Sequence, residues 1–109
     1  MVGRMEKNKF YKLDINKAKG FLFEEELLKE MKDKFFVIID VKKVNDFYVV
    51  KLTEVYAVLV DRIIFRNEYE FIVEDIKRFF ECFIEVSLKD VRDSIDNTQA
   101  LLSKKIFRR

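Results

Sequence analysis

The sequence predicts an α+β fold in which an antiparallel sheet carries a helix on one face and a second helix follows near the C-terminus. Three observations predict it: a short segment with alternating apolar residues, one amphipathic helical segment, and a long stretch rich in β-branched and aromatic residues. The chain has 109 residues, the size of a single domain. We expect a strand–helix–sheet module over residues 1–66, with residues 67–109 as its smaller β or helical continuation in the same compact domain.

The segment 9–15 is the first predicted strand. Its apolar side chains Tyr11, Leu13 and Ile15 alternate with polar ones, and a period of two residues is typical of a strand buried on one face. A connector that ends at Gly20 separates this strand from the next element.

The segment 23–34 is the clearest predicted helix. Leu27, Leu28 and Met31 form an apolar stripe, and three glutamates occupy the first turn, where the helix dipole favours negative charge. Two of the acidic residues are followed four positions later by lysine, which adds favourable pairs. We therefore expect this helix to pack on one face of the sheet.

The middle of the chain is predicted to supply most of the sheet. β-branched and aromatic residues dominate segments 35–44 and 48–52, and the polar pair 45–46 between them predicts a turn. Segment 54–66 has apolar residues at both alternating sets of positions, which predicts one long central strand. The pair 67–68 predicts the turn that follows it.

Residues 69–86 fit two different structures. The many Phe, Ile and Val residues favour two short strands, 70–77 and 79–86, whereas the absence of Gly and Pro favours one helix. The two-strand interpretation is the preferred one. Residues 94–106 then predict a short C-terminal helix with its own apolar set.

The composition argues against an enzyme and against a metal or cofactor site. The chain has no histidine, the usual general base and metal ligand, and a single cysteine, Cys82, excludes a disulfide framework or a multi-cysteine zinc site within it. The only glycines, Gly3 and Gly20, form no phosphate-binding loop. We interpret glutamates 24–26 as a solvated helical turn, Asp40 as a strand-end cap or ion pair, and Cys82 as a small buried hydrophobe. We expect a non-enzymatic protein without a cofactor.

The charge balance indicates at most a local attraction to nucleic acid. The 22 basic and 20 acidic residues give a formal net charge of +2, far from the strongly basic character of proteins that bind duplex DNA. Basic residues gather in segments 4–19 and 104–109, either as a solvated surface or as a contact for RNA or another acidic partner. Without an export signal or an apolar run long enough to span a membrane, we expect a cytoplasmic protein.

One cluster of side chains has a composition suited to nucleic-acid recognition. Lys77 and Arg78 stand next to Phe80 and Phe83, and basic residues interleaved with aromatic ones can hold phosphates while bases stack on the rings. The alternative, favoured for so short a chain, places Phe79, Phe80 and Phe83 in the core.

The order of the segments carries a family resemblance. Residues 10–13 match an opening strand, 21–28 a Leu-Phe-containing turn into a helix, 36–44 the following strand, and 60–66 a strand that leads into a second domain. In this order the chain resembles the stalk subunit of archaeal RNA polymerase and its eukaryotic seventh-subunit relative. Residues 80–86 are similar to the central hairpin of an OB-type RNA-binding barrel, which would be truncated here and lack the family's glycines.

The resemblance implies a transcription-associated protein that contacts a polymerase subunit or another protein and, if its second half binds nucleic acid, single-stranded RNA. An archaeal source follows from the family, and the abundant Lys and Glu without His are also compatible with a thermophile or its virus. The implied contact residues are Phe21, Leu22 and Phe23 for the partner subunit, and Lys77, Arg78, Phe80 and Phe83 for RNA. The alternative is a structural or regulatory interaction protein that forms a homodimer and has no nucleic-acid activity. A viral protein is one form of this alternative. In both cases the 15% aromatic content predicts apolar surface left over for a protein partner.

Overall fold

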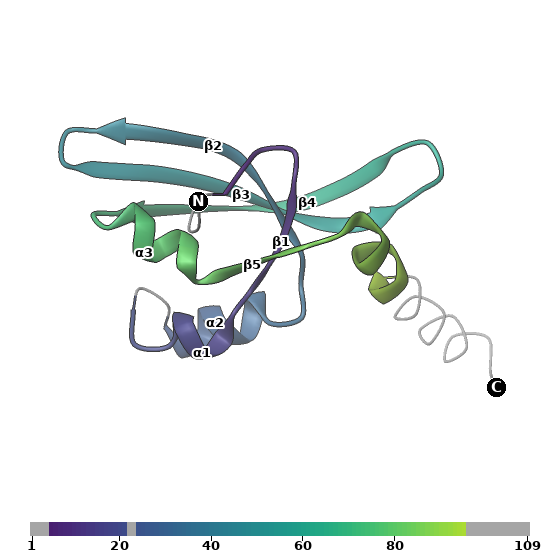
Figure 1. The fold of residues 1–109 in the computed structure, drawn as a ribbon, viewed down its shortest axis with the longest axis horizontal. Helices are drawn as coiled ribbons and strands as arrows, with labels where there is room; N and C mark the ends of the chain where they lie inside the picture. The colour runs from purple at the N-terminus through teal and green to yellow at the C-terminus, as the bar shows by residue number, and fades with distance from the viewer. Residues whose placement is uncertain (1–4, 22–23, 96–109) are drawn as a thin grey trace.

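The structure, a computed structural model, describes residues 5–21 and 24–95. Its elements are β1 (Phe10–Leu13), α1 (Ile15–Ala18), α2 (Glu25–Met31), β2 (Phe36–Val44), β3 (Phe47–Val58), β4 (Ile63–Val73), α3 (Ile76–Glu81) and β5 (Phe83–Val86), and residues 88–95 form a further helix. The strands make one antiparallel sheet in the order β4-β3-β2-β1-β5 (Figure 1). The predicted α+β fold is therefore confirmed. β4 runs through residues 66 and 67, where the sequence suggested a boundary between the two parts.

The two short helices α1 and α3 begin at aspartate caps. The Asp14 carboxylate accepts a hydrogen bond from the backbone N–H of Lys17 at 3.3 Å, and the Asp75 carboxylate accepts one from the N–H of Arg78 at 3.0 Å. Such caps satisfy backbone donors that have no partner in the first helical turn. They fix the points at which the chain leaves β1 and β4.

α2 confirms the helix predicted over residues 23–34, although it is shorter. Glu25 and Glu26 lie in its first turn, and Leu28 and Met31 are buried. The helix ends at Met31 because Asp33 adopts a left-handed conformation, with φ at 62°, which cannot continue a right-handed helix. Residues 22 and 23 lie outside the described part of the chain.

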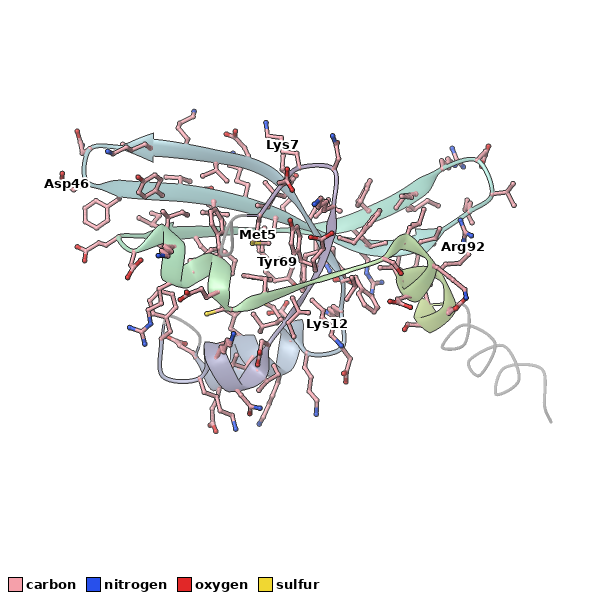
Figure 2. All side chains as sticks on the ribbon, in the orientation of Figure 1. Met5, Lys7, Lys12, Asp46, Tyr69 and Arg92 are labelled. Carbon is pink, nitrogen blue, oxygen red and sulfur yellow. The ribbon has the colours of Figure 1, made fainter. Side chains whose placement is uncertain are left out.

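The turn predicted at residues 45–46 joins β2 to β3. Val44 pairs with Phe47 across it, and Asn45 takes the positive φ of 56° that asparagine tolerates better than most residues. The resulting hairpin forms one end of the molecule, with Asp46 at its tip (Figure 2).

The single long strand predicted over residues 54–66 is wrong. The chain reverses at residues 59–62, where the backbone N–H of Leu59 donates to the carbonyl of Arg62 at 2.8 Å. Segment 54–66 is therefore a hairpin made from the end of β3 and the start of β4. We call this hairpin the arm. In Figure 1 it points away from the β2–β3 hairpin, at the opposite end of the molecule.

The turn predicted at residues 67–68 is also wrong, because both residues lie inside β4. Asn67 has a φ of 56° and is an extra residue opposite the step from Thr53 to Glu54, so it forms a β-bulge. The Thr53 hydroxyl donates toward the carbonyl oxygens of Arg66 and Asn67, at 3.5 and 3.3 Å, and ties the bulge to β3. Asn67 was a correct signal for a left-handed residue, but not for a chain reversal.

Residues 69–86 contain both structures that the sequence left open, so the two-strand interpretation is wrong for its middle part. β4 extends to Val73, α3 occupies Ile76–Glu81, and β5 follows as a four-residue strand paired with β1. An OB-type barrel is not confirmed.

Buried side chains form two cores on opposite faces of the sheet. The main core lies between the sheet and helices α1, α2 and α3, and Phe36 and Phe79 are fully buried in it. The small core contains Val55, Val58 and Val91, and it lies between the arm and the helix at 88–95. Because neighbouring residues of a strand point to opposite faces, Phe36 belongs to the main core whereas the next residue, Val37, packs on the small core.

The last described helix starts earlier than predicted. The sequence placed a helix at residues 94–106, whereas the helix already covers 88–95, and residues 96–109 lie outside the described part. Within the described residues, no helix is long and apolar enough to cross a membrane.

Candidate protein-interaction surfaces

The residues predicted to bind RNA lie on and just after α3. Lys77 and Arg78 are exposed, Phe80 is half-buried against the main core, and Phe83 is buried. The centre of the Phe83 ring lies 5.3 Å from that of Phe79, and Phe83 also makes a T-shaped contact with the ring of Phe36 in the main core. A ring packed in this way offers no face on which a base can stack, so the basic pair stands apart from an exposed aromatic surface.

Of the residues predicted to contact a partner subunit, Phe21 is described, whereas Leu22 and Phe23 lie outside the described residues. Phe21 is half-buried against the main core, and the guanidinium of Arg78 lies 4.5 Å from the centre of its ring. This cation–π contact joins two residues that the sequence assigned to different partners. Phe21, in the segment before α2, and Arg78, in α3, are therefore already in contact with each other.

Cys82 is buried, as interpreted from the sequence. Its Sγ lies 3.4 Å from the carbonyl oxygen of Arg78 and 3.7 Å from that of Lys17, and burial raises the pKa of the thiol. Because the reactive form of cysteine is the thiolate, a buried thiol with a raised pKa is a poor nucleophile. Cys82 thus contributes to packing.

A buried ion cluster, which the sequence did not predict, lies at the base of the arm. The Glu54 side chain is only 5% exposed; its Oε1 is 3.4 Å from Lys34 Nζ, and its Oε2 accepts from Arg66 Nε at 3.2 Å. Asn67 Nδ2 donates to Oε1 at 3.3 Å. Two cations and an amide compensate the buried carboxylate, so the cluster joins the bulged strands and offers no free acid or base.

A cleft of about 430 Å³ opens beside this cluster. The ring of Tyr56 stands over the guanidinium of Arg66 at 4.3 Å on one side of it, and Ile95 of the 88–95 helix lies on another. The lining holds two acidic and two basic residues, Asp33, Glu54, Lys34 and Arg66. A lining with balanced charges, most of which already pair with each other, selects no class of charged ligand.

The tip of the arm exposes apolar side chains. At the tip Val60 is fully exposed and Leu59 is 42% exposed. Nearer the base of the arm, Tyr56 and Phe65 are 45% and 44% exposed. Large apolar side chains that gather on a protruding hairpin are typical of a surface that contacts another protein.

A second exposed apolar surface lies on the face of the sheet opposite the main core. Val49 and its cross-strand partner Ile72 lie on this face, because paired residues point the same way. Phe47, two residues before Val49 on β3, points to the same face, and so does its partner Val44. Val44, Phe47 and Ile72 are 44%, 41% and 64% exposed. We call these four residues the apolar quartet and the surface that carries them the outer face.

The sequence did not single out either surface, because alternating apolar residues look the same whether or not something covers them. Comparisons with known proteins found no matching family model, no matching curated protein and no matching solved structure. Among the described residues, no group of His, Cys, Asp or Glu side chains could hold a metal ion.

Proposed function

We propose that this chain is a non-enzymatic binding protein that acts through protein–protein contacts, with the arm as its contact surface for a partner protein. The observation that carries the proposal is the exposed tip of the arm. Val60 is fully exposed beside the exposed Leu59, and Tyr56 and Phe65 are exposed lower on the same hairpin, which projects from the rest of the fold. Covering such side chains removes apolar area from water and drives association.

The chemistry of the described side chains supports binding over catalysis. The buried carboxylate of Glu54 is already paired, and the Cys82 thiol is buried with a raised pKa. Neither group has a neighbouring histidine, because the chain contains none. A nucleophile without an activating base is a weak catalyst.

A protein partner is better supported than RNA. Lys77 and Arg78 are exposed and can attract phosphate, but Phe83 is buried and Phe80 is half-buried, so base stacking lacks its surface. The resemblance to the polymerase stalk makes a polymerase subunit the first partner to test. Association with transcription remains a proposal that rests on this resemblance.

Affinity capture of the tagged full chain from its native host tests the proposal. We expect a protein partner that is retained after nuclease treatment and lost when Val60→Asp places a charge at the tip of the arm. The matched control is Ile84→Asp, because Ile84 is an exposed apolar residue of β5, away from the arm. Both sites are exposed, so neither variant is expected to unfold the chain.

Three outcomes would contradict the proposal. Loss of the partner on nuclease treatment indicates an RNA bridge, and loss in both variants indicates a general defect rather than a contact at the arm. Recovery of no partner other than the chain itself removes the proposed role of the arm. Recovery of polymerase subunits would support the transcription-associated form of the proposal.

A further inference from the structure

The outer face is a regular array of cross-strand pairs. The pair Val49–Ile72 continues onto β2 through Lys42, and the next row along β3 contains Asp40, Lys51 and Glu70. The apolar quartet therefore occupies the end of the array near the β2–β3 hairpin. Charged residues occupy the rows that follow.

The described part of the chain leaves this array uncovered. Helices α1, α2 and α3 all contribute buried residues to the main core, on the other face of the sheet. The helix at 88–95 shares the face of the outer array but packs at the arm, through Val91 and Ile95. Ile72, the most exposed member of the quartet, is 64% exposed as a result.

We propose that the outer face is a self-association surface, and that its occupant is the outer face of a second copy of this chain. The proposal rests on the proposed function, since it assumes that the chain acts through protein contacts, and it names a second partner at a different surface. Two sheets that pack face to face bury their apolar rows in a layer about 10 Å thick. The quartet of each copy would then cover the quartet of the other.

The charges of the outer face favour a second copy over a strongly charged partner. Its rows mix Lys42 and Lys51 with Asp40, Glu68 and Glu70, so the two signs nearly cancel. A second copy therefore brings both signs to the interface, and the lysines of one copy can offset carboxylates of the other. Nucleic acid or an acidic peptide would meet the carboxylates of β4 without a compensating excess of positive charge.

The size of the face sets the expected strength of the dimer. Three strands about 4.8 Å apart and seven residues along β3 give a footprint of roughly 300 Å². This is below the roughly 800 Å² of accessible surface that each partner contributes to a standard stable interface. We therefore expect a weak dimer that exchanges with monomer and becomes populated only toward the upper end of the micromolar concentration range.

Sedimentation velocity of the purified full chain, across the micromolar range, tests the inference. We expect a concentration-dependent shift from 13.2 kDa toward twice that mass. Ile72→Lys should weaken the dimer at least about tenfold, because it places an ammonium on the most exposed apolar side chain of the quartet, at the β4 edge of the layer. Ile84→Lys is the matched control: the same substitution at an exposed isoleucine on the same face of the sheet, but on β5 at the opposite edge and outside the three-strand footprint, so it should leave the dimer unchanged.

A chain that stays monomeric throughout the series overturns the inference, as does an equal effect of the two isoleucine variants. Loss of the dimer in Val60→Asp together with its retention in Ile72→Lys would assign self-association to the arm instead. Circular dichroism and thermal unfolding verify that each variant is folded. If the chain is monomeric but still captures a partner through Val60, this inference fails while the proposed function stands.

Discussion

The two cores of this molecule differ in size and in what covers them. Among the described residues, the main core contains fifteen buried side chains from both ends of the chain, whereas the small core contains three. The main core is covered by three helices, and the small one by the single helix at 88–95. Stability is therefore expected to depend chiefly on the main core, and the position of the arm on the small one.

The bulges explain how one sheet can serve both cores. Ile39, Tyr56 and Asn67 are the extra residues at the three shifts in strand register, and each is exposed. A bulge increases the local twist and bends the strand that contains it. The arm can therefore diverge from the β2–β3 hairpin, so that each end of the sheet is covered on a different face.

Truncation of Phe79 should have the largest effect on stability. Its ring is fully buried and lies 5.1 Å from Phe71 and 5.3 Å from Phe83. Phe79→Ala should lower the free energy of unfolding by about 3–5 kcal/mol, measured by urea denaturation, because it removes a large buried ring and leaves a cavity. Phe65→Ala, at an exposed phenylalanine of the arm, should cost less than about 1 kcal/mol. Similar losses in the two variants would contradict the difference between the core and the arm.

Truncation of Val91 should have a smaller and more local effect. Val91 is fully buried in the small core against Val55 and Val58. Val91→Ala removes two carbons from apolar contact and should cost about 1.5 kcal/mol. Hydrogen exchange should accelerate in the arm and the 88–95 helix, while the amides of the β2–β3 hairpin stay protected. Uniform acceleration throughout the sheet would instead mean that the two cores unfold as one unit.

Elements with a strong local signal could be predicted from the sequence. The apolar stripe of α2, the alternation of Tyr11 and Leu13 in β1 and the asparagine turn at Asn45 each act within a few residues and are present in the structure. Ile15, predicted as the third apolar residue of that first strand, instead begins α1, because Asp14 caps a helix there. The reversal at 59–62 contains Asp61 as its one common turn residue, and β-branched residues lie on both sides. Its position depends on the pairing along the whole of β3 and β4, from Val58–Ile63 to Tyr48–Val73, which local propensity does not contain.

One local signal was present but overlooked. Asp75, followed by Ile76 and a basic pair, has the character of a helix cap, and its carboxylate does cap α3. Recognition of that cap would have placed a short helix between two strands and Phe79 on its buried side. The exposed surfaces are a different case, because whether a helix covers Ile72 depends on tertiary packing. No pattern within β4 specifies it.

The main core should also respond to alkaline pH, through Tyr69. Its ring makes an edge contact with Phe36 at 5.5 Å, and its hydroxyl donates toward Glu30 Oε1 at 3.5 Å. Burial, followed by the negative charges of Glu30 and Glu54, raises the pKa of Tyr69 from 10.0 to about 12. Because the folded state holds the neutral phenol more strongly than the unfolded state does, this contribution to stability is complete below pH 10 and is lost as the pH rises toward 12.

Unfolding measured at a series of pH values between 9 and 12 tests this expectation, with tyrosinate absorbance recorded in parallel. In Tyr69→Phe the loss of stability above pH 10 should become shallower, since no phenol at that position can ionise. The slope will not vanish, because burial also raises the pKa of Tyr11 in the same core. An identical slope in the two proteins would mean that Tyr69 ionises as readily folded as unfolded. The ring would then be accessible to water, and the contact between α2 and β4 would be looser than the contacts of Tyr69 with Phe36 and Glu30 indicate.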